Sequence, residues 1–275
     1  MLINFSKMHG LGNDFVVIDA VNQAIDLSEE QIRQLADRHY GIGFDQMLLV
    51  RPAQTGADFR YVIYNADGSE VSQCGNGARC FALFVKQKGL SDKSSIRVET
   101  GAGELVLNID AANQITVDMG APIFEPAIIP LNSAQRQSLY SVEAAAVQLE
   151  FSAISMGNPH AVIEVDDLQQ SDVEVLGAAM ESHPIFPERA NIGFSEISNP
   201  HQLKLRVYER GAGETLACGS GACAAVVAGI QRGHLTSPVR VELAGGELTI
   251  AWQGEGQPVM MSGPASFVFD GMIEL

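Results

Sequence analysis

The stretch Cys74-Gly75-Asn76-Gly77-Ala78 returns in altered form as Cys218-Gly219-Ser220-Gly221-Ala222. The two copies lie 144 positions apart in a chain of 275 residues, so each half of the chain supplies one matched thiol. A proton that leaves one face of a carbon and returns to the other face needs an acid-base group on each side. The pair of motifs therefore indicates a racemase or an epimerase.

The likeness between the two halves extends beyond the cysteines. The matched segments are Arg60–Asn65 with Lys204–Glu209, Arg97–Glu99 with Arg240–Glu242, Gly103–Leu105 with Gly246–Leu248, Gly12–Asn13 with Gly157–Asn158, and Ile42–Phe44 with Ile192–Phe194. Chance explains so many matches in one order poorly. We therefore predict an internal duplication over nearly the whole chain.

Alternating apolar segments dominate both halves, and few stretches have a helical pattern. The segment Ser28–Gln31 has the form of a capping box, after which Ile32, Leu35, Ala36 and His39 fall on one helical face. A helix is therefore expected to begin after Ser28.

Two more helices are expected after the cysteine motifs, from about Gly77 to Gly89 and from about Gly221 to Gly233, because glycine commonly ends a helix. Cys80 and Cys223 lie inside these helices among apolar neighbours and are expected in the core. The sequence thus predicts an α+β fold of two pseudo-symmetric duplicated domains, each with strands wrapped around a central helix.

The domain boundary is expected where the repeat is weakest, in the proline-rich segment 119–150. We predict an N-terminal domain of residues 1–118 and a C-terminal domain of residues 119–263. The last segment, 264–275, has the pattern of one more strand, and we expect it to return to the first domain.

The balance of 17 basic against 33 acidic side chains gives a net charge of -16, which argues against nucleic-acid partners and anionic membrane surfaces. The first twenty residues lack the pattern of a signal peptide, and no apolar run approaches the ~20 residues of a membrane helix. We expect a cytoplasmic protein with reduced thiols.

A cysteine just before a helix start lies among backbone N–H groups that the helix leaves unpaired, at the positive end of the helix dipole. Such a position can lower a thiol pKa from ~8.5 into the range of roughly 3.5 to 7.5. The same N–H groups can hold a substrate carboxylate and stabilise the charge that develops when its α-proton leaves.

Three kinds of site with a bound group compete with this reading. Four thiols could bind zinc, but the Cys-x5-Cys and Cys-x4-Cys spacings are not those of common zinc sites. Gly219–Ala224 fits the dinucleotide pattern, with Glu242 about twenty residues on, but eight residues separate it from the preceding strand. Lys7 is the one lysine near a motif that could hold pyridoxal phosphate. We predict a reaction without cofactor or metal.

The chain also resembles a known family, the diaminopimelate epimerases, along its entire length. The motifs that carry this resemblance are Lys7–Phe15, Gly43–Gln46, Asn65–Glu70, Cys74–Cys80, Ser155–His160, Arg189–Phe194 and Glu209–Thr215. The resemblance implies the interconversion of LL- and meso-2,6-diaminopimelate for lysine and cell-wall synthesis. It also implies the duplicated α+β fold and a homodimer, in which Phe269 stands where many relatives have tyrosine.

The resemblance further implies a role for each site residue. Cys218 would take the α-proton of the LL form and Cys74 would return one to the opposite face. The reacting carboxylate would be held by Gly75, Asn76, Gly219 and Ser220. The distal carboxylate would be bound by Arg210 with Asn65, Asn158 and Asn191, while Asn13 and Gln46 complete the polar lining. Glu209 would lie near the distal ammonium and, with His160, near the thiols.

Other functions on the same scaffold remain open at this point. Proline racemase and the phenazine-pathway isomerase share the duplicated fold, and the first also uses two cysteines. Arg210 and the asparagines favour a substrate with a second charged end over proline. A protein that only binds amino acids in a thiol-lined cleft is the third possibility.

Overall fold

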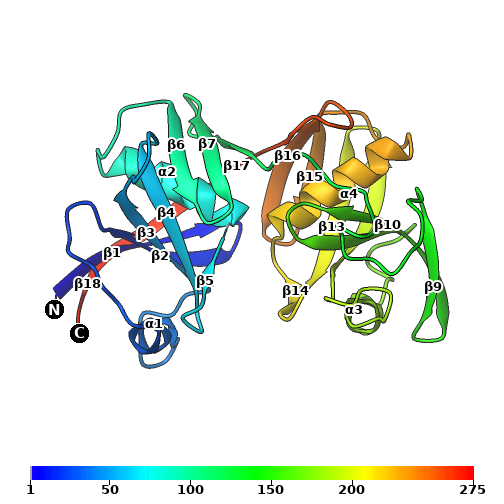
Figure 1. Ribbon diagram of the computed structural model, residues 1–275, viewed down its shortest axis with the longest axis horizontal. Coiled ribbons are helices and arrows are strands. Elements are labelled where there is room, and N and C mark those ends of the chain that lie inside the picture. The colour runs from blue at the N-terminus through cyan, green and yellow to red at the C-terminus, as the bar shows by residue number, and fades with distance from the viewer. Residues whose placement is uncertain (1, 73) are drawn as a thin grey trace. The chain divides into compact units, whose positions relative to one another are not determined.

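The computed structural model describes residues 2–72 and 74–275. The chain forms two compact units, one made of the residues up to Asp118 together with Ser262–Leu275, the other of Met119–Met261. Figure 1 shows strands and helices in both units, as the predicted α+β class requires. No helix in residues 2–72 and 74–275 is long and apolar enough to cross a membrane.

The first unit carries both the earliest and the latest strand of the chain. Its elements are β1 (Leu2–Gly10), β2 (Asn13–Asp19), α1 (Glu29–Ala36), β3 (Gln46–Pro52), β4 (Phe59–Asn65), β5 (Glu70–Val71), α2 (Gly75–Gln87), β6 (Ser95–Thr100), β7 (Gly103–Ile109), β8 (Ile115–Asp118) and β18 (Ser266–Glu274). β18 pairs antiparallel with β1, with Leu2 opposite Glu274. The expected return of the last segment to the first half is confirmed.

The second unit repeats the order of the first. Its elements are β9 (Tyr140–Ala144), β10 (Val147–Ser155), β11 (Pro159–Glu164), α3 (Val173–Glu181), β12 (Asn191–Asn199), β13 (Gln202–Glu209), β14 (Gly213–Thr215), α4 (Gly219–Gln231), β15 (Val239–Leu243), β16 (Gly246–Trp252) and β17 (Val259–Gly263), whose last residues belong to the first unit. β10 takes the place of β1, and α4 takes the place of α2.

Strand pairing confirms the duplication. In the first unit β1 and β2 are antiparallel, β2 and β3 parallel, β3 and β4 antiparallel, and β4 and β6 parallel. In the second unit β10 and β11 are antiparallel, β11 and β12 parallel, β12 and β13 antiparallel, and β13 and β15 parallel. Each hairpin of the first pair turns at a glycine of positive φ, Gly12 at +89° and Gly157 at +88°.

One of the sequence matches between the halves is wrong. The parallel register places Phe15 opposite Gln46 and His160 opposite Asn191, so Gln46 and Asn191 are equivalent. Ile42–Phe44 therefore precedes β3, whereas Ile192–Phe194 lies inside β12. A shared tripeptide produced the false match, because strand register and not local identity fixes which residues correspond.

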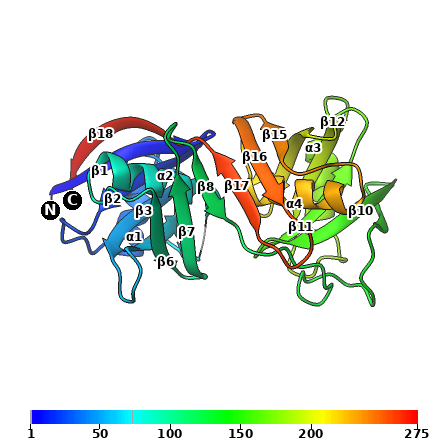
Figure 2. The same ribbon diagram turned by 90° about the horizontal axis from the view of Figure 1, so that it is seen from above.

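Strands surround the helix that follows each cysteine motif. α2 contacts β1, β2, β3, β7 and β8, and α4 contacts β10, β11, β12 and β16 (Figures 1 and 2). Ten consecutive residues of α2, from Asn76 to Val85, are buried, and Cys80 and Cys223 are fully buried, as predicted. Gly89 and Gly233 follow the two helices in the left-handed conformation, at φ +66° and +77°.

The first helix of the chain begins as predicted and ends earlier. The Ser28 hydroxyl accepts a hydrogen bond from the Gln31 N–H, and the Ser28 N–H donates to Gln31 Oε1 at 2.9 Å. α1 nevertheless stops at Ala36, so the prediction that His39 shares its buried face is wrong. The Asp37 carboxylate accepts hydrogen bonds from the N–H groups of His39 and Tyr40 and holds them in a turn instead.

A histidine interrupts the apolar core of the second unit. His160 is 1% exposed on β11, at the position that Phe15 occupies on β2 in the first unit. Burial, and secondly the charge of Arg210, lowers the pKa of His160 from its ordinary 6.5 to about 3. The imidazole is therefore neutral at physiological pH.

We predict that acid destabilises the second unit through His160. Between about pH 6.5 and 3 the unfolded chain binds a proton at this ring and the folded chain does not, so its stability falls as the pH falls, by up to about 1.4 kcal/mol per pH unit. Trp252, the single tryptophan of the chain, lies in the second unit and reports its urea unfolding by fluorescence.

The His160→Phe variant, which copies the first unit, is the matched control. Its urea midpoint is expected to change less between pH 7 and pH 4 than that of the unaltered chain. An equal change in both proteins would contradict the assignment of this acid sensitivity to His160.

Candidate active site

The first motif cysteine caps the central helix of its unit. Cys74 has extended backbone geometry at the N-cap of α2, and its sulfur accepts a hydrogen bond from the Gly77 N–H at 3.4 Å. The buried Tyr61 hydroxyl donates to the Cys74 carbonyl at 3.2 Å. A Cβ at position 77 would lie 2.3 Å from that hydroxyl, so the second glycine of the motif is needed for close packing.

Amide side chains lie next to this helix start. Asn76 Nδ2 donates to Asn13 Oδ1 at 3.4 Å, which brings the end of β1–β2 to the first turn of α2. Gln46 Nε2 donates to Asn65 Oδ1 at 2.9 Å across the β3–β4 pair. The structure thus joins two pairs of predicted site residues in the first unit.

An ionic cluster that sequence reasoning missed supports Asn13. Asp45 accepts a hydrogen bond from Asn13 Nδ2 at 2.9 Å and pairs with Arg38 at 2.7 Å. Burial acts to raise the pKa of the neighbouring Asp14, but hydrogen bonds from Arg38 and Lys7 outweigh it and hold that pKa well below its usual value. The sequence offered one indication of this role, since Asp45 directly precedes the predicted site residue Gln46.

The second motif cysteine also caps a helix, but in a different electrostatic setting. Cys218 is 4% exposed at the N-cap of α4. Burial raises the pKa of its thiol well above the ordinary value, and the Glu209 carboxylate raises it further, against a smaller lowering by the Gly221 N–H. For this cysteine the predicted lowering is wrong, because desolvation outweighs the helix start.

A chain of polar contacts leads away from Cys218. Its sulfur lies 3.7 Å from the Ser220 hydroxyl, which accepts a hydrogen bond from Asn158 Nδ2 at 3.4 Å. Asn158 Oδ1 lies 3.0 Å from His160 Nε2, so this ring nitrogen carries the proton. His160 Nδ1 is buried without a hydrogen-bond partner in the described part of the chain.

Glu209 is held beside Cys218 by a residue that the sequence analysis did not select. The Thr215 hydroxyl on β14 donates to Glu209 Oε1 at 2.5 Å. Because β14 pairs antiparallel with β13, it carries Thr215 back alongside the strand that ends at Glu209. The spacing of Glu209 and Thr215 around a glycine-rich turn could have indicated this contact.

The next residue, Arg210, is anchored through its backbone and remains exposed at its side chain. Its N–H donates to Asn191 Oδ1 at 3.0 Å, while Asn191 Nδ2 donates to the Pro159 carbonyl at 3.0 Å. Its Nη1 donates to the Glu188 carbonyl at 3.2 Å. The second unit therefore gathers Asn158, His160, Asn191, Glu209, Arg210, Cys218 and Ser220.

The alternative sites find little support in this geometry. Residues 2–72 and 74–275 contain no group of three or more His, Cys, Asp or Glu side chains that could hold a metal ion. The dinucleotide pattern needs a strand that runs straight into its glycines. Here β13 ends at Glu209 and β14 intervenes before α4.

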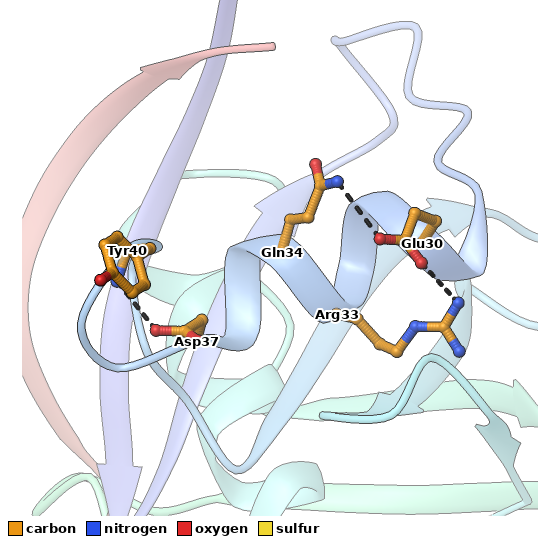
Figure 3. Close-up of a pocket in the computed structure, with 5 residues that line it drawn as sticks. All are labelled: Glu30, Arg33, Gln34, Asp37 and Tyr40. Carbon is orange, nitrogen blue, oxygen red and sulfur yellow. Dashed lines mark hydrogen bonds and ion pairs between the residues drawn. The ribbon is translucent and has the colours of Figure 1, made fainter.

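Two surface hollows lie away from the predicted residues. One, of about 460 Å³, lies on α1, with the Glu30–Arg33 ion pair near one end and Asp37 and the 94% exposed Tyr40 near the other (Figure 3). The other, of about 630 Å³, lies between β1, β18 and the end of α2, next to Lys88 and Asp270. Neither contains a cysteine or an amide of the candidate site, so neither is a candidate for the reaction.

Two thiols at equivalent helix starts can exchange a proton with an acidic carbon. The helix starts and the amide groups beside them can hold a carboxylate.

The model of the diaminopimelate epimerase family matches residues 5–125 and 152–268 of this chain. A protein of Nitrosospira multiformis named diaminopimelate epimerase is 57% identical over 275 residues, which cover 100% of this chain and 99% of the relative.

Solved structures of more distant proteins share the fold. A phenazine biosynthesis protein of the PhzF family from Bacillus anthracis matches with a TM-score of 0.72 and 19% identity, covering 100% of both chains. A hydroxyproline epimerase from Agrobacterium vitis with bound trans-4-hydroxy-L-proline matches with a TM-score of 0.70 and 15% identity, covering 99% of this chain and 92% of the other.

These distant likenesses confirm the duplicated fold and do not by themselves distinguish its functions. The sequence motifs do distinguish them, because the family model spans both cysteine motifs and the relative matches from end to end. This chain belongs to the diaminopimelate epimerase family.

Proposed function

We propose that the chain interconverts LL- and meso-2,6-diaminopimelate without a cofactor, through one thiolate and one thiol. Family membership makes the chain an isomerase. The observation that carries the mechanism is the presence of one cysteine at the N-cap of the equivalent helix in each duplicated unit, Cys74 on α2 and Cys218 on α4. We propose that the two units act as the two epimerase domains, which the sequence bounded at 1–118 with 264–275 and at 119–263, within two residues of the bounds of the units.

In the LL to meso direction the Cys218 thiolate removes the α-proton. A sulfur–hydrogen bond forms, the carbon–hydrogen bond breaks, and its electron pair moves into the α-carboxylate. Cys74 then delivers its proton to the opposite face of the carbon and is left as the thiolate. In the meso to LL direction the roles of Cys74 and Cys218 exchange.

The backbone N–H groups at both helix starts stabilise the charge that develops on the carboxylate. The residues that supply them are Gly75, Asn76, Gly219 and Ser220. A fixed set of donors of this kind lowers the barrier because it needs no reorganisation when the proton leaves.

Glu209 is the base that can form the Cys218 thiolate. Burial is the main reason for the raised pKa of Cys218, and the charged carboxylate beside the thiol raises it further because it disfavours a second negative charge. The same carboxylate can accept the thiol proton, which leaves a thiolate beside a neutral acid. Thr215 fixes Oε1 of Glu209. His160 contributes a neutral ring near the thiols, because its pKa of about 3 keeps it uncharged.

The distal end of the substrate is read by charged and amide groups. Arg210 binds the distal carboxylate with the fork geometry that guanidinium groups favour, and Asn65, Asn158 and Asn191 assist it. Glu209 lies near the distal ammonium. Asn13 and Gln46 complete the polar lining. A substrate with two charged ends suits this set better than proline, which would require an apolar wall.

The proposed reaction places the chain in lysine biosynthesis and in the supply of the peptidoglycan precursor. Its substrate is a small molecule, and its location is the cytoplasm. A net charge of -16 is unfavourable for a nucleic-acid partner or an anionic membrane surface.

We also propose a homodimer formed through β18. Its side chains Val268, Phe269 and Met272 are 52%, 46% and 68% exposed, which leaves apolar surface on a strand that is bound to the unit through β1. Exposed apolar side chains gathered along one strand in this way favour an interaction site. Phe269 also packs edge-on against Phe5, at 6.1 Å between ring centroids, and so holds a fixed position on that surface.

Incubation of the reduced, cofactor-free protein with LL-diaminopimelate in heavy water tests the reaction. We expect deuterium at a single α-carbon together with the meso isomer. Cys74→Ala and Cys218→Ala are each expected to lower the rate of meso formation at least ~10²-fold, because each removes an acid-base group. Cys223→Ala, a core thiol, is the matched control and should keep the rate. Exchange of the proline α-proton with none for diaminopimelate would select proline racemisation instead.

Mild oxidation tests whether both thiols reach one carbon. Diamide should remove two protons and two electrons from Cys74 and Cys218, join their sulfurs, and abolish activity until a thiol reductant restores it. The peptide map of the oxidised protein should contain the Cys74–Cys218 bridge. Inactivation with both thiols still alkylatable would contradict a shared substrate.

The oligomeric state tests the proposed dimer. Light scattering after gel filtration should give twice the chain mass of 29.4 kDa, and Phe269→Asp should return the mass to that of one chain. Val147→Asp replaces another apolar residue, 45% exposed on β10, and should leave the dimer intact. A single-chain mass for the unaltered protein would exclude the dimer.

A further inference from the structure

A charged side chain is buried at the start of the first central helix. Arg79 lies in the first turns of α2, is 0% exposed, and is among the largest fully buried side chains in the described part of the chain. Burial of a guanidinium is costly unless hydrogen bonds and charges around it compensate. A buried charge beside a candidate site therefore suggests a role in that site.

The guanidinium contacts the residues that open the helix. Arg79 Nη2 donates to Asn76 Oδ1 at 3.0 Å, and Nη1 donates to the Gly75 carbonyl at 3.4 Å. Nε donates to the Pro264 carbonyl at 3.1 Å, so the same side chain also fixes the segment that leads into β18. Gly10 leaves room for it, since a Cβ there would lie 3.2 Å from Nη2.

These contacts set the direction of the neighbouring donors. An amide has its oxygen and its NH₂ group on opposite sides, so Asn76 can only direct Nδ2 away from the guanidinium, and Nδ2 indeed points to Asn13 Oδ1. The peptide between Gly75 and Asn76 is planar, with its carbonyl opposite its N–H. A donor that holds the Gly75 carbonyl therefore also fixes the direction of the Asn76 N–H.

We propose that Arg79 is the positioning residue of the first-half carboxylate site, which orients the amide and the backbone N–H of Asn76 toward the substrate carboxylate. This role rests on the proposed reaction and deepens it. The second half does without it, because Cys223 occupies the position equivalent to Arg79, and Ser220 the position equivalent to Asn76. Serine has no amide to orient, so the arginine and the asparagine belong together.

A double-mutant cycle tests this coupling. The four proteins are the unaltered chain, Arg79→Met, Asn76→Ser, which copies the second half, and the double variant. Initial rates of α-deuterium exchange with diaminopimelate give KM and kcat for each. Arg79→Met should raise KM about tenfold, a difference of about 1.4 kcal/mol in binding. In the Asn76→Ser background the same change should raise KM threefold or less.

Arg51→Met, which alters an arginine on β3 of the same unit, is the control for the loss of an arginine as such and should leave KM unchanged. If Arg79→Met does not fold, Arg79→Lys replaces it in the cycle, because lysine keeps the charge but lacks the fork of nitrogens that contacts Asn76 Oδ1 and the Gly75 carbonyl together. The same pattern is expected, with a rise in KM that Asn76→Ser largely removes.

The outcomes separate this role from its alternatives. An equal rise in KM in both backgrounds, or a fall in kcat at constant KM, would overturn the positioning role. Failure of the unaltered chain to exchange the α-proton of diaminopimelate would instead refute the proposed reaction. Loss of stability with unchanged KM would make Arg79 a purely structural residue and would also overturn the proposal.

Discussion

The backbone N–H groups in the first turn of a helix have no partner within that helix, and the candidate site is built on this constraint twice. Cys74 and Cys218 stand where those groups converge, at the start of α2 and of α4. These N–H groups bind an anion more strongly when they are shielded from water, and the strands around each helix provide that shielding. The glycines of the motif follow from the same closeness, because Gly77 and Gly221 have neighbours within 2.3 Å and 3.1 Å of a hypothetical Cβ.

The two units share a backbone and differ in the side chains that carry charge. Asn65 stands where the second unit has Glu209, Phe15 where it has His160, and Arg79 where it has Cys223. A fixed cation thus lies at one helix start and a carboxylate at the other. The diaminopimelate site proposed here must tell two ends of one molecule apart, and a perfectly symmetric duplication would offer the same surface to both.

Sequence alone predicted the fold because its strongest signals are local and repeated. The glycine-flanked cysteines, the capping box at Ser28 and the terminal strand all carry their own geometry, and each was confirmed. The errors arose where long-range packing decides. The helix α1 ends at Ala36, before His39. Strand register makes Gln46 equivalent to Asn191, although the local sequences differ. Burial raises the pKa of Cys218 by more than the helix start lowers it.

The same limit applied to the supporting residues of the site. Three residues outside the predicted set hold members of it: Asp45 holds Asn13, Thr215 holds Glu209, and Arg79 holds Asn76. A single sequence does not directly mark which side chains contact one another. Thr215 and Arg79 lie near their partners in sequence, so a motif read with helix and hairpin geometry in mind could have found them. The contact of Asp45 with Asn13 spans 32 residues and needs the structure.

The pairing of β18 with β1 joins the last strand of the chain to its first. During synthesis β1 leaves the ribosome long before residues 266–274, which form β18, are made. The first unit can therefore complete its hydrogen-bonded ladders only after the residues of the second unit have been added. For as long as translation continues, Ile3 and Phe5 stand on an open strand edge, and this part of the nascent chain is the one most in need of protection from aggregation.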